Sequence, residues 1–184
     1  NSYKFNPELF DIWMRVVRGT PGSVLWLSSM NSAARRNLMN EAHSRGVDPT
    51  RLIFAPFLPD SAGHLARLRC ADLFFDTLPY NAHATASDAL FAGLPVLTCK
   101  GTTFAGRVAA SLLEAAGLPE LVTESLADYE ALSMRLARDA SLHAGFKARL
   151  TQSRTAGTLF DTATFTGQLE SAYLTLCEEP TRRV

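Results

Sequence analysis

The sequence lacks the features of several common protein classes. No apolar stretch approaches the ~18 residues that a membrane-spanning helix needs. The 18 lysine and arginine residues balance the 18 aspartate and glutamate residues, so the formal net charge is zero. Nucleic-acid-binding domains usually carry a clear excess of basic residues. We therefore expect neither a membrane partner nor a nucleic-acid partner.

Cysteine is also scarce, and the common catalytic and nucleotide-binding motifs are absent from the sequence. The 3 cysteines, Cys70, Cys99 and Cys177, are widely spaced and form no CxxC pair. We expect reduced thiols in a cytoplasmic protein. The four histidines lack metal-ligand spacing, and no GxSxG, GxGxxG or GxxxxGK[ST] motif is present. The sequence therefore predicts no metal ion or other cofactor, and it does not support a serine hydrolase, a dinucleotide fold or a P-loop.

What the chain does contain is enough apolar sequence for one core. Of the 184 residues, 47% are apolar, and a chain of this length buries roughly 70% of its unfolded surface. The first residue is Asn1 and not Met, and no signal-like segment follows. We expect a fragment of a longer chain.

Short apolar runs alternate with segments of helical periodicity. The expected strands are residues 23–27, 52–54, 71–76 and 95–98, and the expected helices are about 6–17, 32–45, 60–69, 84–92, 105–116 and 160–177. This alternation predicts a doubly wound, Rossmann-like parallel sheet covered by helices. After about residue 123 only helical patterns follow. We therefore expect a single α/β domain over residues 1–184, with an all-helical part at about 124–184.

Ligands of such sheets bind beyond the carboxyl ends of the strands. Two expected strand-to-helix loops qualify, residues 76–85 and 101–107. In the first, the helix N-terminus, the Thr85 hydroxyl and the His83 ring could donate to a phosphate. Each candidate also has a structural interpretation. Asp88 could complement the helix dipole, Thr85 could cap the helix, and Lys4 could be a solvated charge.

The longest of these segments carries a resemblance to a known family. Residues 76–98 read DTLPYNAHATASDALFAGLPVLT, and residues 106–113 read GRVAASLL. Together with residues 3–7, 23–27, 160 and 169–173, they resemble O-linked N-acetylglucosamine transferases, in particular the bacterial homologues. The resemblance covers nearly the whole chain.

This resemblance implies the donor-nucleotide-binding, C-terminal half of a GT-B glycosyltransferase. It implies that the N-terminal catalytic half and the tetratricopeptide repeats, which hold the acceptor protein, are absent from this chain. The implied reaction transfers N-acetylglucosamine from UDP-GlcNAc to Ser or Thr hydroxyls, with inversion and without a metal. We expect the fragment alone to be inactive.

The family's functional residues carry over to eight positions. The resemblance implies that Lys4 stabilises the diphosphate as a catalytic residue and that Asn1 touches the same group. It implies that His64 packs on the uracil and that Arg67 lies near the base. The implied phosphate-loop residues are His83, Ala84 and Thr85, and Asp88 would accept from the ribose hydroxyls. An acceptor-only carboxylate suits two adjacent hydroxyl donors.

The sequence departs from the family pattern in two places, and these departures leave other functions open. Ala84 stands where the family loop usually has threonine, and residues 58–64 form a stretch one residue longer than in the animal enzymes. A degenerate, non-catalytic module that binds a nucleotide or a protein is therefore one alternative. A relative that transfers fucose from GDP-fucose is another, although such enzymes lack the histidine equivalent to His83. A receiver-like signalling domain is disfavoured, because no acidic cluster follows the first strand.

Overall fold

Parallel strand pairs form the centre of the fold. The computed structural model describes residues 2–157 and 159–178. Its strands are β1 (Leu25–Ser28), β2 (Leu52–Ala55), β3 (Phe74–Phe75), β4 (Val96–Cys99) and β5 (Val122–Thr123). β1 pairs with β2, and β4 lies between β3 and β5, with every pair parallel. The predicted parallel α/β architecture is confirmed.

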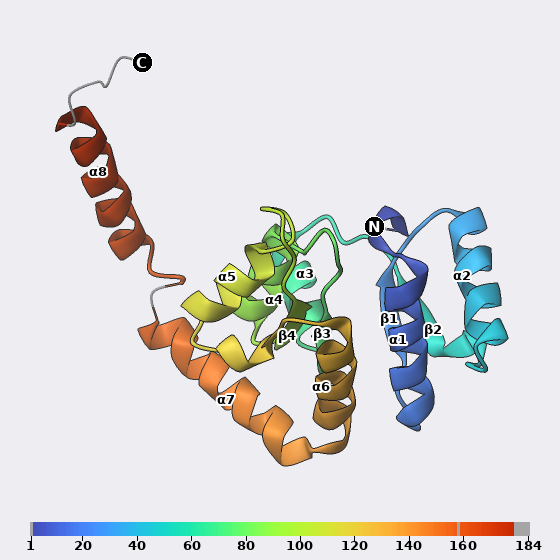
Figure 1. Cartoon of the computed structure of the whole chain (residues 1–184). Coiled ribbons are helices and arrows are strands. Elements are labelled where there is room, and N and C mark those ends of the chain that lie inside the picture. Colours follow the sequence, from blue (N-terminus) through green and yellow to red (C-terminus); the bar gives the residue numbers. More distant parts are fainter. Residues whose placement is uncertain (1, 158, 179–184) are drawn as a thin grey trace.

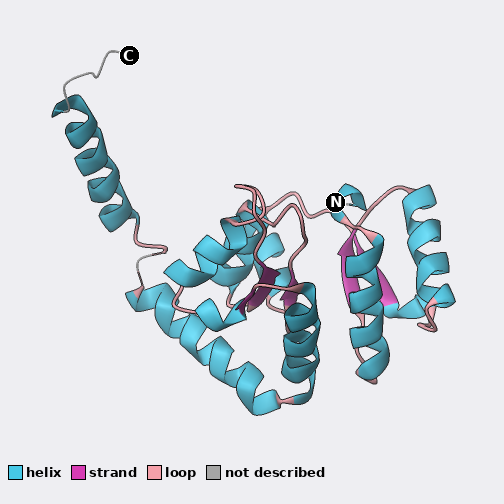
Figure 2. Cartoon of the chain, in the orientation of Figure 1, coloured by secondary structure: helices cyan, strands magenta, loops and turns pink. Residues whose placement is uncertain are grey.

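Helices connect and cover these strands (Figure 2). They are α1 (Pro7–Gly19), α2 (Ser32–Ser44), α3 (Ser61–Leu68), α4 (Ala84–Ala92), α5 (Val108–Ala115), α6 (Leu126–Arg138), α7 (Ala140–Ala156) and α8 (Thr162–Glu178). Short 3-10 turns occur at η1 (Ser2–Lys4), η2 (Pro49–Arg51) and η3 (Pro119–Leu121). No described helix is long and apolar enough to cross a membrane.

The predicted elements differ from the observed ones mainly in length. The third strand covers residues 74–75 and not 71–76, and α5 begins at residue 108 and not 105. The sequence did not predict β5, because only Leu121 and Val122 are apolar between Glu120 and Thr123, which is too short a run to recognise. Beyond β5 the described residues form the helices α6, α7 and α8.

α1 is the best-buried helix of the first half. Asn6 caps it by accepting from the N–H of Leu9 at 2.8 Å, and Pro7 occupies the first helical position. The helix packs against α6, where the Trp13 indole donates to the Tyr129 hydroxyl at 3.3 Å. That hydroxyl donates in turn to the main-chain oxygen of Asp76 at 3.1 Å. A buried hydrogen-bonded chain therefore links α1 and α6 to the end of β3.

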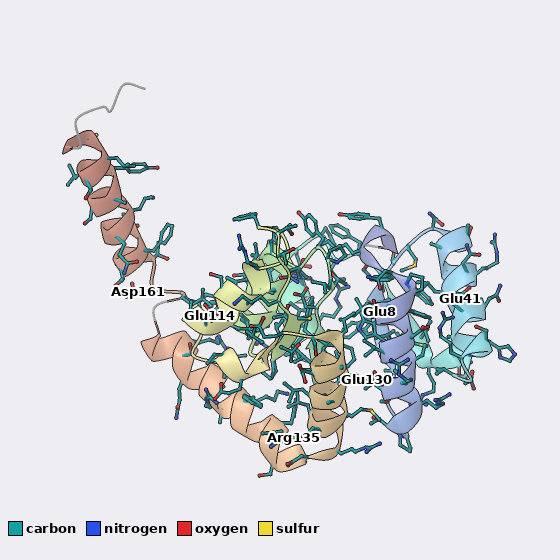
Figure 3. All side chains as sticks on the ribbon, viewed as in Figure 1. Glu8, Glu41, Glu114, Glu130, Arg135 and Asp161 are labelled. Atoms are coloured by element: carbon teal, nitrogen blue, oxygen red, sulfur yellow. The ribbon has the colours of Figure 1, made fainter. Side chains whose placement is uncertain are left out.

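Figure 1 shows β1 and β2 beside α1 and α2, and β3 and β4 among α3 to α7. α6 lies next to α1 and joins the two groups of elements. Side chains fill the space between these two helices (Figure 3), and Arg15 of α1 forms an ion pair with Glu130 of α6 at 2.6 Å.

All four residues of β4 are buried, and α4, α5 and α6 contact this strand. Burial on both faces explains why its sequence is continuously apolar apart from Thr98.

α8 stands apart from the rest of the molecule (Figures 1 and 3). Its large apolar side chains are exposed, among them Phe165, Leu169 and Tyr173. Contact with the body is made just before the helix, where the ring of Phe160 meets Phe91 of α4 edge-on at 5.3 Å between centroids. The body of the fold therefore builds its core from the residues before α8.

Candidate functional site

Two loops meet at the carboxyl ends of β3 and β4. We call residues 76–83, which lead into α4, the α4 loop, and residues 100–107, which lead into α5, the α5 loop. The N–H of Asn81 donates to the carbonyl of Ala105 at 2.9 Å and joins them. The α4 loop contains a cis peptide bond between Leu78 and Pro79.

Gly106 allows these loops to approach one another closely. A Cβ atom at this position would lie 2.9 Å from the carbonyl oxygen of Pro79 and 3.2 Å from the Cα of Gly101. Both neighbours are backbone atoms, so neither can move aside as a flexible side chain would. A glycine at position 106 is therefore required for this contact.

Asp76, the first residue of the α4 loop, is buried and holds this loop against the end of β4. Its side chain is 2% exposed, and its two oxygens accept from the N–H of Ala82 at 2.6 Å and from the Thr98 hydroxyl at 2.7 Å. Burial raises the pKa of this carboxyl from 3.8 to about 6, although hydrogen bonds from Thr98, Ala82 and Thr77 and the charge of Lys4 oppose the change. The carboxylate thus fixes the peptide just before α4.

The N-terminus of α4 is open to a ligand. His83 is its N-cap residue and makes no side-chain capping bond. Ala84 and Thr85 follow and are exposed, and their N–H groups have no acceptor among the described residues. Unpaired N–H groups and the helix dipole together favour an anion at this position.

Lys4 reaches this loop from the start of the chain. Its ammonium donates to the carbonyl oxygen of Asn81 at 2.9 Å and lies 4.1 Å from the centroid of the Tyr80 ring. The contact spans 77 positions of sequence. A positive charge is thereby held beside the residues that precede α4.

The His83 ring is held between two aromatic side chains. It stacks on Tyr80 with 5.0 Å between centroids and 16° between planes, and it meets Phe104 of the α5 loop edge-on at 6.3 Å. Its Nε2 atom lies 3.4 Å from the carbonyl oxygen of Ala105. That acceptor favours the tautomer in which Nε2 carries the proton.

A second group of side chains lies between α3 and α4. The Nε2 atom of His64 is 3.5 Å from a carboxylate oxygen of Asp88, and its Nδ1 atom is 3.4 Å from Nη2 of Arg67. Arg67 also donates to the carbonyl of Pro56 and lies over the Trp26 ring at 5.8 Å. The side chain of Asp88 is 47% exposed, so it is accessible to a ligand.

α4 connects the side chains around His83 with those around His64. Thr85 and Asp88 are three residues apart in one helix, so their side chains share a face with a rise of about 4.5 Å between them. Seven of the eight predicted site residues therefore lie on or beside the first turns of α4: Lys4, His64, Arg67, His83, Ala84, Thr85 and Asp88. The eighth, Asn1, lies outside the described residues. The ligand roles of all eight stay predictions.

Sequence reasoning missed the residues that hold this arrangement together. Asp76, Tyr80, Asn81 and Phe104 all fall inside the two predicted loops, but none was assigned a role. A buried aspartate directly after an apolar run was the one available signal for Asp76. The contacts of Tyr80 and Asn81 with Lys4 depend on tertiary structure and leave no pattern in the sequence.

The arrangement combines an anion-binding helix end with a hydroxyl acceptor. Lys4, the His83 ring and the first N–H groups of α4 offer positive charge and donors, and Asp88 offers carboxylate oxygens one turn further on. Among residues 2–157 and 159–178, no group of three or more His, Cys, Asp or Glu side chains could hold a metal ion. A phosphorylated ligand with free hydroxyl groups suits this set of side chains.

Residues 1–169 match the family model of Glycosyl transferase family 41. The chain is 33% identical over 168 residues to a UDP-N-acetylglucosamine--peptide N-acetylglucosaminyltransferase of Caenorhabditis elegans, covering 91% of this chain and 14% of the relative. It is 34% identical over 172 residues to the probable enzyme SEC of Arabidopsis thaliana, covering 93% of this chain and 18% of that protein. The chain thus spans less than a fifth of either relative.

A solved structure agrees with the sequence relatives. A mutant O-GlcNAc transferase of Thermobaculum terrenum superposes with a TM-score of 0.85 at 32% identity, covering 92% of this chain and 33% of that one. The fold predicted from the sequence and the resemblance stated for it are both confirmed.

Proposed function

This chain belongs to glycosyltransferase family 41, and we propose that it forms the donor-nucleotide-binding part of a protein O-GlcNAc transferase. Its ligand would be UDP-GlcNAc, and the product that it releases would be UDP. The observation that carries this proposal is the meeting of Lys4, His83 and Asp88 around the first turns of α4.

The diphosphate would lie at the N-terminus of α4. As the bond to the sugar breaks, the leaving UDP gains negative charge, and donors already in place stabilise it. Lys4 and the N–H groups of Ala84 and Thr85 would supply them. Such donors could take the place of a metal ion, so they support the metal-independent part of our proposal, an inverting transfer without a metal.

The nucleoside would lie between α3 and α4. Asp88 would accept from the ribose hydroxyls, and His64 and Arg67 would contact the uracil. Because His64 lies 3.5 Å from Asp88, a bound ribose would bring its hydroxyl groups beside both side chains. We assign no general base for the acceptor hydroxyl to this chain.

The acceptor would be a Ser or Thr residue of a protein. In our proposal, acceptor binding belongs to the N-terminal catalytic half and the tetratricopeptide repeats of a longer enzyme. Cys70, Cys99 and Cys177 are free, which suits the reducing cytoplasm in which we place it.

Calorimetric titration tests this function. We expect UDP to bind in the presence of EDTA, more tightly than GDP or ADP, and Asp88→Ala to weaken UDP binding at least about tenfold. Glu114→Gln removes an exposed carboxylate on α5 (Figure 3) and serves as the matched control. Tighter binding of GDP would indicate a GDP-sugar donor. A folded sample that binds none of the three would favour the non-catalytic module.

A further inference from the structure

One aromatic ring contacts both of the side chains that would approach the diphosphate. The Tyr80 ring has the Lys4 ammonium 4.1 Å from its centroid and stacks on the His83 ring at 5.0 Å. We propose that Tyr80 is a positioning residue, which holds Lys4 and His83 in place for the nucleotide diphosphate. This inference rests on the proposed function.

Lys4 depends on Tyr80 for one of its two anchors. A lysine side chain loses considerable conformational freedom when it is fixed. The ammonium is fixed here by the Asn81 carbonyl at 2.9 Å and by the face of the Tyr80 ring, whose quadrupole attracts a cation. Removing the ring leaves a single hydrogen bond on a flexible side chain, so the cation would occupy the phosphate-binding position less often.

His83 depends on the same ring for its orientation. Phe104 touches the imidazole edge-on, and that residue is itself 77% exposed. The stacking on Tyr80 at 16° between planes sets the ring plane, and Nε2 then faces the carbonyl of Ala105 at 3.4 Å. Without the stacked ring, the imidazole could rotate away from the start of α4.

Tyr80 is well placed for this role because its own backbone is fixed. Its carbonyl accepts from the Thr77 hydroxyl at 2.6 Å, and the preceding carbonyl, of Pro79, lies against Gly106. The Tyr80 hydroxyl has no hydrogen-bond partner among the described residues. The ring, and not its hydroxyl group, therefore carries the function, and phenylalanine should replace it.

Substitutions at position 80 test the proposal. We expect Tyr80→Leu to weaken UDP binding about fivefold, the size of one cation–π contact at a partly exposed site, and Tyr80→Phe to stay within about twofold of the wild type. Tyr173→Leu, the same change at an exposed position on α8, should leave the affinity unaltered. Since Tyr80 is 45% exposed and Tyr173 is 60% exposed, we expect the variants at both positions to fold. Tyr80→Met provides a second non-aromatic variant.

Two further measurements separate positioning from a general structural role. In a background that carries Lys4→Met and His83→Ala, Tyr80→Leu should change the affinity less than about twofold, because the groups it positions are gone. In the nucleotide-free protein, NMR should show ring-current shifts of the His83 ring protons that persist in Tyr80→Phe and become smaller in Tyr80→Leu, where only the Phe104 ring remains.

The outcomes distinguish this inference from the proposed function. A wild-type protein that binds no UDP overturns both. A wild-type protein that binds UDP, with Tyr80→Leu binding equally well, overturns only the role of Tyr80. Equal weakening by Tyr80→Phe and Tyr80→Leu would show that the hydroxyl matters, and it would also overturn the assignment of the role to the ring.

Discussion

The carboxylate of Asp76 and the hydroxyl of Thr98 lie 2.7 Å apart and join the carboxyl ends of β3 and β4. The other carboxylate oxygen accepts from the N–H of Ala82, so the same side chain also holds the peptide that precedes α4. One buried charge thus connects the sheet to the candidate site.

Asp76→Asn should remove a specific pH dependence of stability. Burial raises the pKa of Asp76 from 3.8 to about 6, so the folded protein retains a proton that the unfolded chain has already lost. The contribution of this group to the free energy of unfolding therefore falls as the pH rises between those values. At 1.36 kcal/mol per pKa unit, the full change is roughly 3 kcal/mol.

Urea unfolding between about pH 4 and about pH 7 measures this change. The unfolding free energy of the wild type minus that of Asp76→Asn should fall by up to roughly 3 kcal/mol over the range. Parallel curves for Asp76→Asn and the wild type would contradict the raised pKa.

Lys4→Met should weaken the binding of UDP but not that of uridine. The ammonium lies beside the residues that precede α4, where the phosphates would bind, whereas in our proposal the uracil contacts His64 and Arg67. We expect a loss of about tenfold for UDP, which is typical of one charge-assisted contact. Lys147→Met on α7 is the matched control. If calorimetry shows equal losses for UDP and uridine, Lys4 does not act on the diphosphate.

Ala84→Thr should strengthen the binding of UDP. Position 84 is exposed at the start of α4, and a hydroxyl there would add a donor next to a free N–H group. One additional hydrogen bond corresponds to an affinity gain of about fivefold. Ala84→Val has the same shape without the hydroxyl, and it should bind UDP as the wild type does. A gain in both variants, or in neither, would rule out a hydroxyl contact at this position.

Arg51→Met should destabilise the protein without altering the site. The guanidinium donates to the carbonyls of Val17, Thr20 and Ser23 at 2.7–2.8 Å and thereby satisfies the end of α1. Removing three charge-assisted hydrogen bonds to part-buried carbonyls should cost about 2–4 kcal/mol in chemical unfolding, although the oxygens of Val17 and Thr20 keep other donors. Arg36→Met, at an exposed arginine of α2, should cost less than about 0.5 kcal/mol. A loss of UDP affinity in folded Arg51→Met would contradict a purely structural role.

The sequence predicted the fold well because its strongest signals are local. The predicted runs at residues 23–27, 52–54 and 95–98 overlap the strands at 25–28, 52–55 and 96–99. In the third of these strands every residue is buried, which favours a nearly continuous apolar sequence. The predicted ends of the helices and strands were less accurate than their positions. Residues 105–107 look helical, but Gly106 packs against Pro79 and the N–H of Gly106 bonds to Thr103, so α5 starts later.

The candidate site was predictable only for the residues that would touch a ligand. His83, Thr85 and Asp88 lie within one continuous motif, so the resemblance to a family could identify them. The partners that orient them come from elsewhere in the fold. The Lys4–Asn81 contact joins positions 77 residues apart, and no spacing rule connects an N-terminal lysine to a distant main-chain oxygen.

The close approach of the α4 and α5 loops has a kinetic consequence. Because Gly106 lies against Pro79 and Asn81 bonds to Ala105, the two loops are joined by contacts of their own that need no nucleotide. We expect nucleotide association to be a single exponential process whose rate rises linearly with nucleotide concentration, since no slow rearrangement limits it. Differences in affinity among site variants should then arise chiefly from how long the complex lasts.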